Sequence, residues 1–145
     1  MLERDAPVPT VSAANQDGET ITPNFSTPTV VYFYPKDDTP GCSVEAEQFD
    51  ESFEAYLDAR VDVFGVSTDT VESHRRFHEK YDLGFDLLAD PAGEIAAAFG
   101  VSTDGGTADR VTFVVDDGEV RRRYATVDPD GHAEDVLAAV RDLTN

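Results

Sequence analysis

The sequence is poor in several features, and each shortage excludes a class of protein. Cys42 is the only cysteine among 145 residues, so this chain can form no internal disulfide, multi-cysteine zinc site or iron–sulfur cluster. No apolar run approaches the roughly 20 residues that a membrane-spanning helix needs. Residues 1–9 include acidic side chains and no apolar core, so no signal peptide is expected. These shortages favour a cytoplasmic, reducing environment.

Positive charge is also scarce. The chain carries 11 Lys and Arg against 30 Asp and Glu, which gives a formal net charge of −19. Such a charge repels nucleic acid and anionic membrane surfaces, and we expect contact with neither. Lys36 and Lys80 are the only lysines. This acid-rich, lysine-poor composition resembles that of proteins from salt-loving organisms, so we expect a halophilic protein whose charges are screened by salt.

The pattern along residues 1–145 shows no internal repeat, low-complexity tract or long linker, so one domain is expected. Turn signals and β-branched runs predict a small N-terminal hairpin around Asp17 and Gly18, strands over 29–34 and 61–67, a short extended segment over 85–91, and a hairpin over 110–127. Helices are expected over 43–59, from Thr70 to before Gly84, over 93–100 and over 129–144. The first helix should bury Phe49, Phe53, Tyr56 and Leu57. This order predicts an α/β fold with a mixed central β-sheet flanked by helices and an N-terminal β-hairpin extension.

Cys42 follows the first long strand and lies in the first turn of the next helix, at the sheet edge where α/β proteins bind ligands. Ionising most of a free thiol at neutral pH takes about 2.7 kcal/mol. A helix N-terminus typically supplies about 0.3 to 1 kcal/mol, so a thiolate here needs a nearby cation. In the alternative interpretation, residues 39–41 form an ordinary helix-entry turn and Cys42 is a buried filler. The turn alone leaves both interpretations open.

Other polar groups are weaker candidates for a site. His74 and His78 are one helical turn apart, but no third ligand of matching pattern is evident, so we expect an exposed polar face and no metal. Asp37 and Asp38 are expected in a solvated loop. The arginines at 121–123 are expected to pair with local carboxylates and not to bind nucleic acid. No cofactor is expected.

A longer motif decides between the two interpretations of the cysteine. The segment VVYFYPKDDTPGCSVEAEQF resembles the active-site segment of the peroxiredoxins, most closely their bacterioferritin-comigratory, or PrxQ, branch. VFGVSTDTVESHRRFHEKYDLGFDLLADPAGEIAAAFGV and RVTFVVDDG continue the resemblance, which covers nearly the whole chain. It implies a thioredoxin-like fold and a thiol-dependent peroxidase that reduces hydrogen peroxide and small organic hydroperoxides.

The resemblance also implies roles for individual residues. Cys42 aligns with the nucleophile that becomes a sulfenic acid, Thr39 with the threonine that hydrogen-bonds peroxide and thiolate, and Arg110 with the cation that the thiolate needs. The substrate pocket is implied to include a shielding proline, a turn glycine and a glutamate that orients the arginine; these are Pro40, Gly41 and Glu45.

The chain departs from the family pattern at one position. Many PrxQ proteins have a resolving cysteine five residues after the nucleophile, where this chain has Glu47. The implied cycle is therefore of the one-cysteine type, in which an external thiol or a thioredoxin-like protein reduces the sulfenic acid. A monomer or weak homodimer is expected. The alternatives are a peroxide-responsive redox sensor and a thiol–disulfide exchange protein, although the latter normally has a second cysteine at the position of Glu45.

Overall fold

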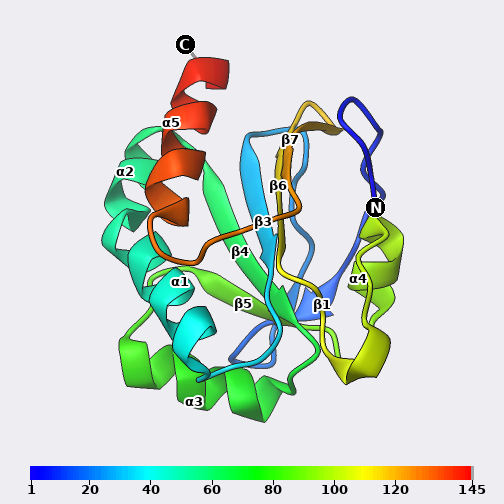
Figure 1. Ribbon diagram of the computed structural model, residues 1–145, viewed down its shortest axis with the longest axis vertical. Helices are drawn as coiled ribbons and strands as arrows, with labels where there is room; N and C mark the ends of the chain where they lie inside the picture. The colour runs from blue at the N-terminus through cyan, green and yellow to red at the C-terminus, as the bar shows by residue number, and fades with distance from the viewer. Residues whose placement is uncertain (145) are drawn as a thin grey trace.

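A mixed five-stranded sheet forms the centre of the computed structural model, which describes residues 1–144. The strands lie in the order β5-β4-β3-β6-β7 (Figure 1). Parallel pairing joins β3 to β4 and β4 to β5, whereas β6 pairs antiparallel with β3 and β7. The predicted mixed sheet is therefore confirmed. The strand bounds are β3 Thr29–Phe33, β4 Asp62–Ser67, β5 Asp86–Ala89, β6 Val111–Asp116 and β7 Glu119–Tyr124.

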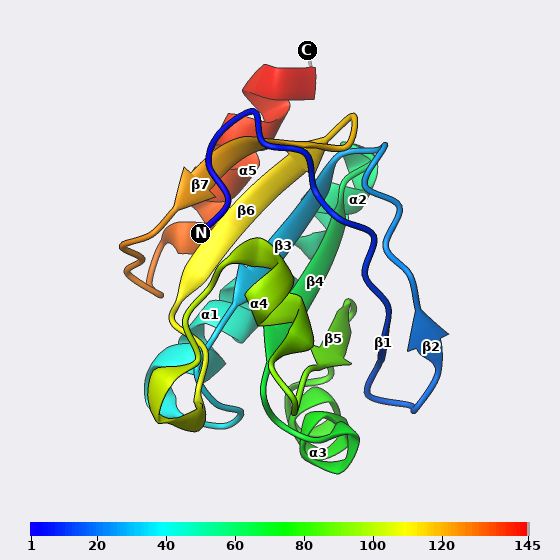
Figure 2. The same ribbon diagram turned by 90° about the vertical axis from the view of Figure 1, so that its right-hand side faces the viewer.

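The N-terminal hairpin is also confirmed. Strands β1 (Ala13–Ala14) and β2 (Thr20–Ile21) pair antiparallel. Gly18 lies in the turn between them with a φ of 80°, a backbone region that suits glycine. The hairpin runs along the side of the molecule where β5 lies (Figure 2). There the Gln16 side chain accepts a hydrogen bond from the backbone N–H of Leu87 at 3.0 Å.

Helices cover both faces of the sheet. Residues of β3 alternate between the two cores, since Val30 and Tyr32 belong to one buried cluster and Val31 and Phe33 to the other. Helices α1, α2, α3 and α5 pack on the first cluster, whereas α4 and the N-terminal segment pack on the second (Figure 1). The bounds are α1 Pro40–Glu51, α2 Phe53–Asp58, α3 Val71–Tyr81, α4 Glu94–Phe99 and α5 His132–Thr144, with a short 3-10 turn at Asp104–Gly106.

The first helical region differs from its prediction. In place of one helix over 43–59, the chain forms α1 and α2, which are separated at Ser52 with φ −91° and ψ −1°. In the second segment Tyr56 is fully buried, while Leu57 is 52% exposed. The predicted burial of Leu57 is therefore wrong. At 3.6 residues per turn Leu57 lies roughly 80° around the helix from Phe49, at the edge of the apolar stripe, where a side chain can remain exposed.

The strand that precedes the cysteine is buried along its whole length. All five residues of β3 are buried, and the chain then enters the loop 34–39 before α1 begins. Because β6 pairs with β3 in the register Phe33 to Val111, the residue that precedes β6 is brought to the carboxyl end of β3. This register places Arg110 beside the start of α1. No helix among residues 1–144 is both long and apolar enough to cross a bilayer.

Candidate active site

Cys42 lies in the first turn of α1, as the sequence predicts. The helix begins at Pro40, and Thr39 precedes it in an extended conformation. This turn has backbone N–H groups that no preceding helical carbonyl can satisfy, and these groups favour an anion. The cysteine is free and 1% exposed. The thiol is thus enclosed at a position where negative charge is favoured.

The guanidinium of Arg110 lies against the thiol. Its Nη2 donates to the sulfur of Cys42 at 3.3 Å, and its Nη1 donates to Oε1 of Glu45 at 2.6 Å. One guanidinium therefore contacts both groups with two nitrogens of its planar fork. The arginine side chain is 18% exposed, so this charge is only weakly screened by solvent. The structure brings these three predicted residues together.

Glu45 lies one helical turn after the cysteine and is completely buried. Its Oε2 atom has no hydrogen-bond partner among residues 1–144. Burial raises the pKa of the Glu45 carboxyl to about 7, although the charge of Arg110 and its hydrogen bond act in the opposite direction. The carboxyl that contacts the arginine is therefore able to change its protonation state near neutral pH.

Gly41 permits the close approach of the arginine to α1. A Cβ atom at this position would lie 3.2 Å from Nη2 of Arg110 and 3.5 Å from Cγ of Pro129. Both contacts are with side chains that enclose the site, so a larger residue would push the guanidinium away from the sulfur. Glycine, which has no Cβ atom, permits this close approach to the backbone.

Thr39 and Pro40 form the turn that precedes Cys42. Within residues 1–144, the Thr39 hydroxyl makes no hydrogen bond to the sulfur. The Thr39 hydroxyl donates to the backbone carbonyl of Lys36 at 2.9 Å. Pro40 occupies the first helical position and is itself exposed. A cavity of about 400 Å³ borders Arg110, but Cys42 is not among its lining residues.

Two residues that the sequence placed in solvent are buried beside this site. His74 is 0% exposed and Asp37 is 7% exposed, so the predictions of an exposed histidine and a solvated aspartate are wrong. The spacing of His74, Phe77 and Tyr81 at i, i+3 and i+7 is the signal that could have identified His74 as core-facing. Asp37, Asp69 and His74 each present a ligand atom within 4.8 Å of the others, so this cluster could hold a metal ion.

Comparisons with known proteins point to one family. The model of the AhpC/TSA family matches residues 5–123. A chloroplastic peroxiredoxin Q from Suaeda salsa is 36% identical over 141 residues, which cover 93% of this chain and 66% of that protein. A putative peroxiredoxin bcp from Coxiella burnetii is 37% identical over 116 residues, which cover 74% of this chain and 77% of that protein. The chain thus spans slightly less than two thirds of the Suaeda protein.

Solved structures of peroxiredoxins are also similar to this chain. Peroxidoxin BcpB from Mycobacterium tuberculosis superposes with a TM-score of 0.91 at 30% identity, covering 99% of each chain. Peroxiredoxin Q from Xanthomonas campestris gives a TM-score of 0.86 at 31% identity, covering 93% of this chain and 92% of that one. This likeness confirms the predicted thioredoxin-like fold.

Proposed function

The chain belongs to the AhpC/TSA family, in its peroxiredoxin Q/Bcp branch as the sequence predicts, and we propose that it is a thiol-dependent peroxidase of the one-cysteine type. Its substrates are hydrogen peroxide and small organic hydroperoxides. The observation that carries the proposal is the contact between Nη2 of Arg110 and the sulfur of Cys42 at 3.3 Å. A permanent cation that donates to an enclosed sulfur stabilises the nucleophilic thiolate.

In the first half-reaction, the Cys42 thiolate attacks the terminal oxygen of the hydroperoxide. A sulfur–oxygen bond forms, the oxygen–oxygen bond breaks, and the leaving alkoxide or hydroxide takes up a proton to give alcohol or water. The sulfur is oxidised by two electrons to a sulfenic acid, and the peroxide is reduced by the same two electrons. Arg110 stabilises the negative charge as it moves from sulfur to the leaving oxygen.

The second half-reaction requires two external thiols. The first condenses with the sulfenic acid of Cys42, forms a mixed disulfide and releases water. The second attacks the mixed disulfide, regenerates the Cys42 thiol and leaves as the external disulfide. The chain has no second cysteine that could replace the first of these thiols.

The remaining pocket residues have supporting roles in this proposal. The Thr39 hydroxyl, three residues before the sulfur, contacts the bound peroxide. Pro40 shields the thiolate from water, and the small volume of Gly41 keeps Arg110 against α1. Glu45 orients the guanidinium through its 2.6 Å contact with Nη1. Because Cys42 is 1% exposed, small hydroperoxides are the preferred substrates.

The setting of the protein follows from its composition. A free thiol nucleophile without a resolving cysteine works in a reducing compartment, and we place this chain in the cytoplasm. The net charge of −19 favours a salt-rich cytoplasm and disfavours contact with nucleic acid or anionic membranes.

Residues 1–145 act as one domain, in a monomer or a weak homodimer. The reductant is a small thiol or a thioredoxin-like protein.

Stopped-flow measurement of peroxide consumption tests the proposal. Wild-type protein with excess dithiothreitol should consume many equivalents of hydrogen peroxide, and Cys42→Ser should consume none above background. Mass spectrometry after one equivalent of peroxide should find one added oxygen on Cys42, removed by two equivalents of thiol. Stoichiometric oxidation without turnover under any thiol would contradict the enzymatic function and leave the redox sensor.

A further inference from the structure

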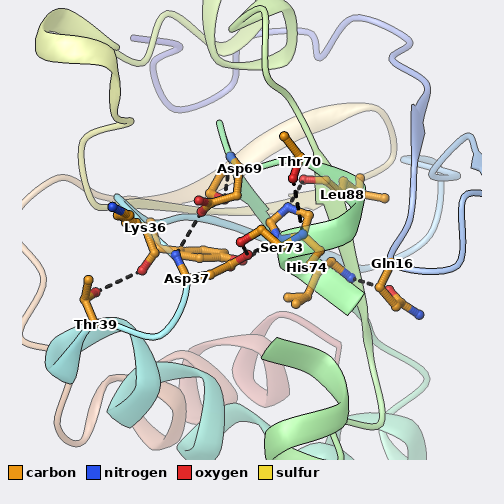
Figure 3. A network of polar contacts seen from close by, with 12 residues as sticks. Gln16, Lys36, Asp37, Thr39, Asp69, Thr70, Ser73, His74 and Leu88 are labelled. Carbon is orange, nitrogen blue, oxygen red and sulfur yellow. Dashed lines mark hydrogen bonds and ion pairs between the residues drawn. The ribbon is translucent and has the colours of Figure 1, made fainter. Parts of the chain in front are cut away.

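A buried polar cluster outside the proposed mechanism surrounds the carboxylate of Asp37. Its Oδ2 lies 2.7 Å from Nδ1 of His74 and accepts a hydrogen bond from the Ser73 hydroxyl at 2.8 Å. Its Oδ1 accepts from the Tyr34 hydroxyl at 2.6 Å. Figure 3 shows Asp37 facing the residues of α3, with its backbone N–H directed at Asp69, which accepts from it at 2.8 Å. Both carboxylate oxygens of Asp37 and its backbone N–H are thus engaged.

The ring of His74 faces an acceptor at each nitrogen. Nδ1 points to the Asp37 carboxyl, and Nε2 lies 3.0 Å from the backbone carbonyl of Leu88 on β5. The ring thus joins Asp37 on the loop to Leu88 on β5 through its two nitrogens.

This pair connects the sheet and α3 to the loop that carries the proposed catalytic residues. Asp37 is two residues before Thr39 and five residues before Cys42 in the sequence. At the other end, His74 is held by Leu88 of the central sheet. Within the loop, the Thr39 hydroxyl closes back onto the Lys36 carbonyl at 2.9 Å (Figure 3). The start of α1 is thus fixed to the sheet through one buried carboxylate.

We propose that Asp37 and His74 are a positioning pair for the peroxidase reaction. They hold the loop 36–39 so that Thr39 and Cys42 meet the peroxide in an attacking geometry. The inference rests on the proposed peroxidase function, because alignment matters only if the thiolate attacks a substrate. A displacement of the nucleophile by about 1 Å can cost about 100-fold in rate, so a pair of residues that holds this loop in place has a large effect on turnover.

A metal ion is the competing occupant of this cluster, and the contacts disfavour it. Oδ2 of Asp37 already faces Ser73 and His74. Oδ2 of Asp69 already accepts from the Asp37 N–H at 2.8 Å and from the Ser67 hydroxyl at 2.6 Å. A cation would have to displace these donors from both carboxylates. Both carboxylate oxygens of Asp37, Oδ2 of Asp69 and both ring nitrogens of His74 already have polar neighbours.

The variants His74→Gln and Asp37→Asn test the pair, and His78→Gln is the matched control. His78 lies on the same helix and also contacts a backbone carbonyl, that of Phe85 at 3.1 Å, and within residues 1–144 it makes no hydrogen bond to the loop 36–39. Two rates are measured below each variant's thermal midpoint: single-turnover oxidation of Cys42 by hydrogen peroxide, and alkylation of Cys42 by iodoacetamide. Ser73→Ala removes a single hydrogen bond to Asp37. This variant replaces His74→Gln and Asp37→Asn in the test if those two do not fold.

Both pair variants should lower the peroxide rate by about tenfold or more, while the alkylation rate stays the same or increases because a loosened loop exposes the sulfur. Ser73→Ala should give a smaller change in the same directions, and His78→Gln should leave both rates within about twofold of wild type. The double variant of Asp37 and His74 should be no worse than the worse single variant, since the two act as a unit.

Three results would contradict the proposal that Asp37 and His74 position the loop. The first is an unchanged peroxide rate in folded His74→Gln. The second is a parallel fall of both rates, which indicates lost thiol ionisation and not lost alignment. The third is stoichiometric Zn²⁺ uptake by the wild type that His74→Gln abolishes, which identifies a metal site. If the wild type does not react with peroxide, the proposed peroxidase function is wrong. In that case, faster alkylation of Cys42 in His74→Gln than in His78→Gln would still show that the pair holds the loop.

Discussion

The guanidinium of Arg110 donates to the sulfur of Cys42 at 3.3 Å while its other terminal nitrogen holds Glu45. Loss of such a preorganised donor in a reaction that moves negative charge typically costs about 100- to 1000-fold. We expect a fall of this size in the second-order rate constant for peroxide in Arg110→Met, measured by stopped flow. Arg110→Lys should retain part of the rate, because an ammonium keeps the charge and loses the planar fork.

The control for this arginine is Arg76→Lys. Arg76 lies on the solvent face of α3, where it pairs with Glu72 and is 75% exposed. Its replacement should leave the rate constant unchanged, since exposed ion pairs contribute little. A rate in Arg110→Met within threefold of wild type would show that the sulfur is activated by another group.

Glu45 should introduce a transition near pH 7 into the rate profile. Burial raises the pKa of this carboxyl to about 7, against the opposing charge of Arg110. Above that pH the ionised carboxylate fixes the guanidinium, and below it the protonated group holds the guanidinium less firmly, so we expect the rate to fall on acidification. Glu45→Gln removes the titration. The ratio of wild-type to variant rates should therefore rise between about pH 6 and 8.

Glu47→Gln is the matched control for the Glu45 experiment. Glu47 is an exposed carboxylate on the same helix, and its replacement should give a constant ratio to wild type across the same pH range. A constant ratio for Glu45→Gln as well would mean that the Glu45 carboxyl does not titrate near pH 7.

His132 should make the fold less stable in acid. Burial lowers the pKa of this imidazole to about 4; the Arg110 charge adds to the effect and Asp135 opposes it. Since the folded-state pKa lies below the ordinary value of about 6.5, the unfolded chain binds more protons between these pH values. The stability that the neutral ring contributes is thus present above about pH 6.5 and lost as the pH falls toward 4. We expect this loss to be of order 2 kcal/mol after allowance for solvent screening.

The measurement compares urea unfolding of wild type and His132→Gln at pH 7.5 and pH 4.5. Glu45 acts in the opposite direction, because its raised folded-state pKa makes stability fall as the pH rises from about 4.5 to 7. That contribution is common to both proteins and cancels in the difference between them. The difference in unfolding free energy should change between the two pH values; the same difference at both would exclude His132 as the source.

The association of Cys42 with Arg110 could be predicted only because the sequence resembles a known family. A buried strand followed by a Pro-Gly turn places the cysteine at a helix start, and a second buried run places Arg110 at the start of a neighbouring strand. The family motif then identifies the arginine as the cation. What the sequence could not provide is the β3–β6 register, which brings residue 110 beside residue 42.

The Asp37–His74 pair could not be predicted in the same way. Its two members are 37 residues apart, and consecutive aspartates in a loop resemble a solvated turn. Only the packing of α3 beside the loop 34–39 gives the carboxylate its buried donors. The break at Ser52 was missed for a related reason, since the apolar period of α1 continues in the sequence after the helix has ended.

Salt should stabilise the fold. The net charge of −19 produces repulsion among carboxylates, and the screening length falls from about 10 Å at 0.1 M salt to about 3 Å at 1 M. We expect the thermal midpoint to rise between dilute buffer and molar KCl at pH 7.5. The rise should shrink near pH 4.1, where the net charge vanishes. A midpoint that does not increase with KCl at pH 7.5 would contradict the halophilic hypothesis.

A cysteine at position 47 should convert the one-cysteine cycle into an internal one, but only if α1 unwinds. Five residues of helix rise about 7.5 Å, which exceeds the roughly 7 Å that a disulfide tolerates between Cα atoms. After one equivalent of peroxide, Glu47→Cys should lose both thiols, release water and lose far-UV helical signal. Wild type should instead hold a sulfenic acid that dimedone traps. Glu51→Cys, about 13.5 Å along the same helix, should behave as wild type. A disulfide in Glu47→Cys without loss of helical signal, or a lasting sulfenic acid in that variant, would show that α1 does not unwind as this prediction requires.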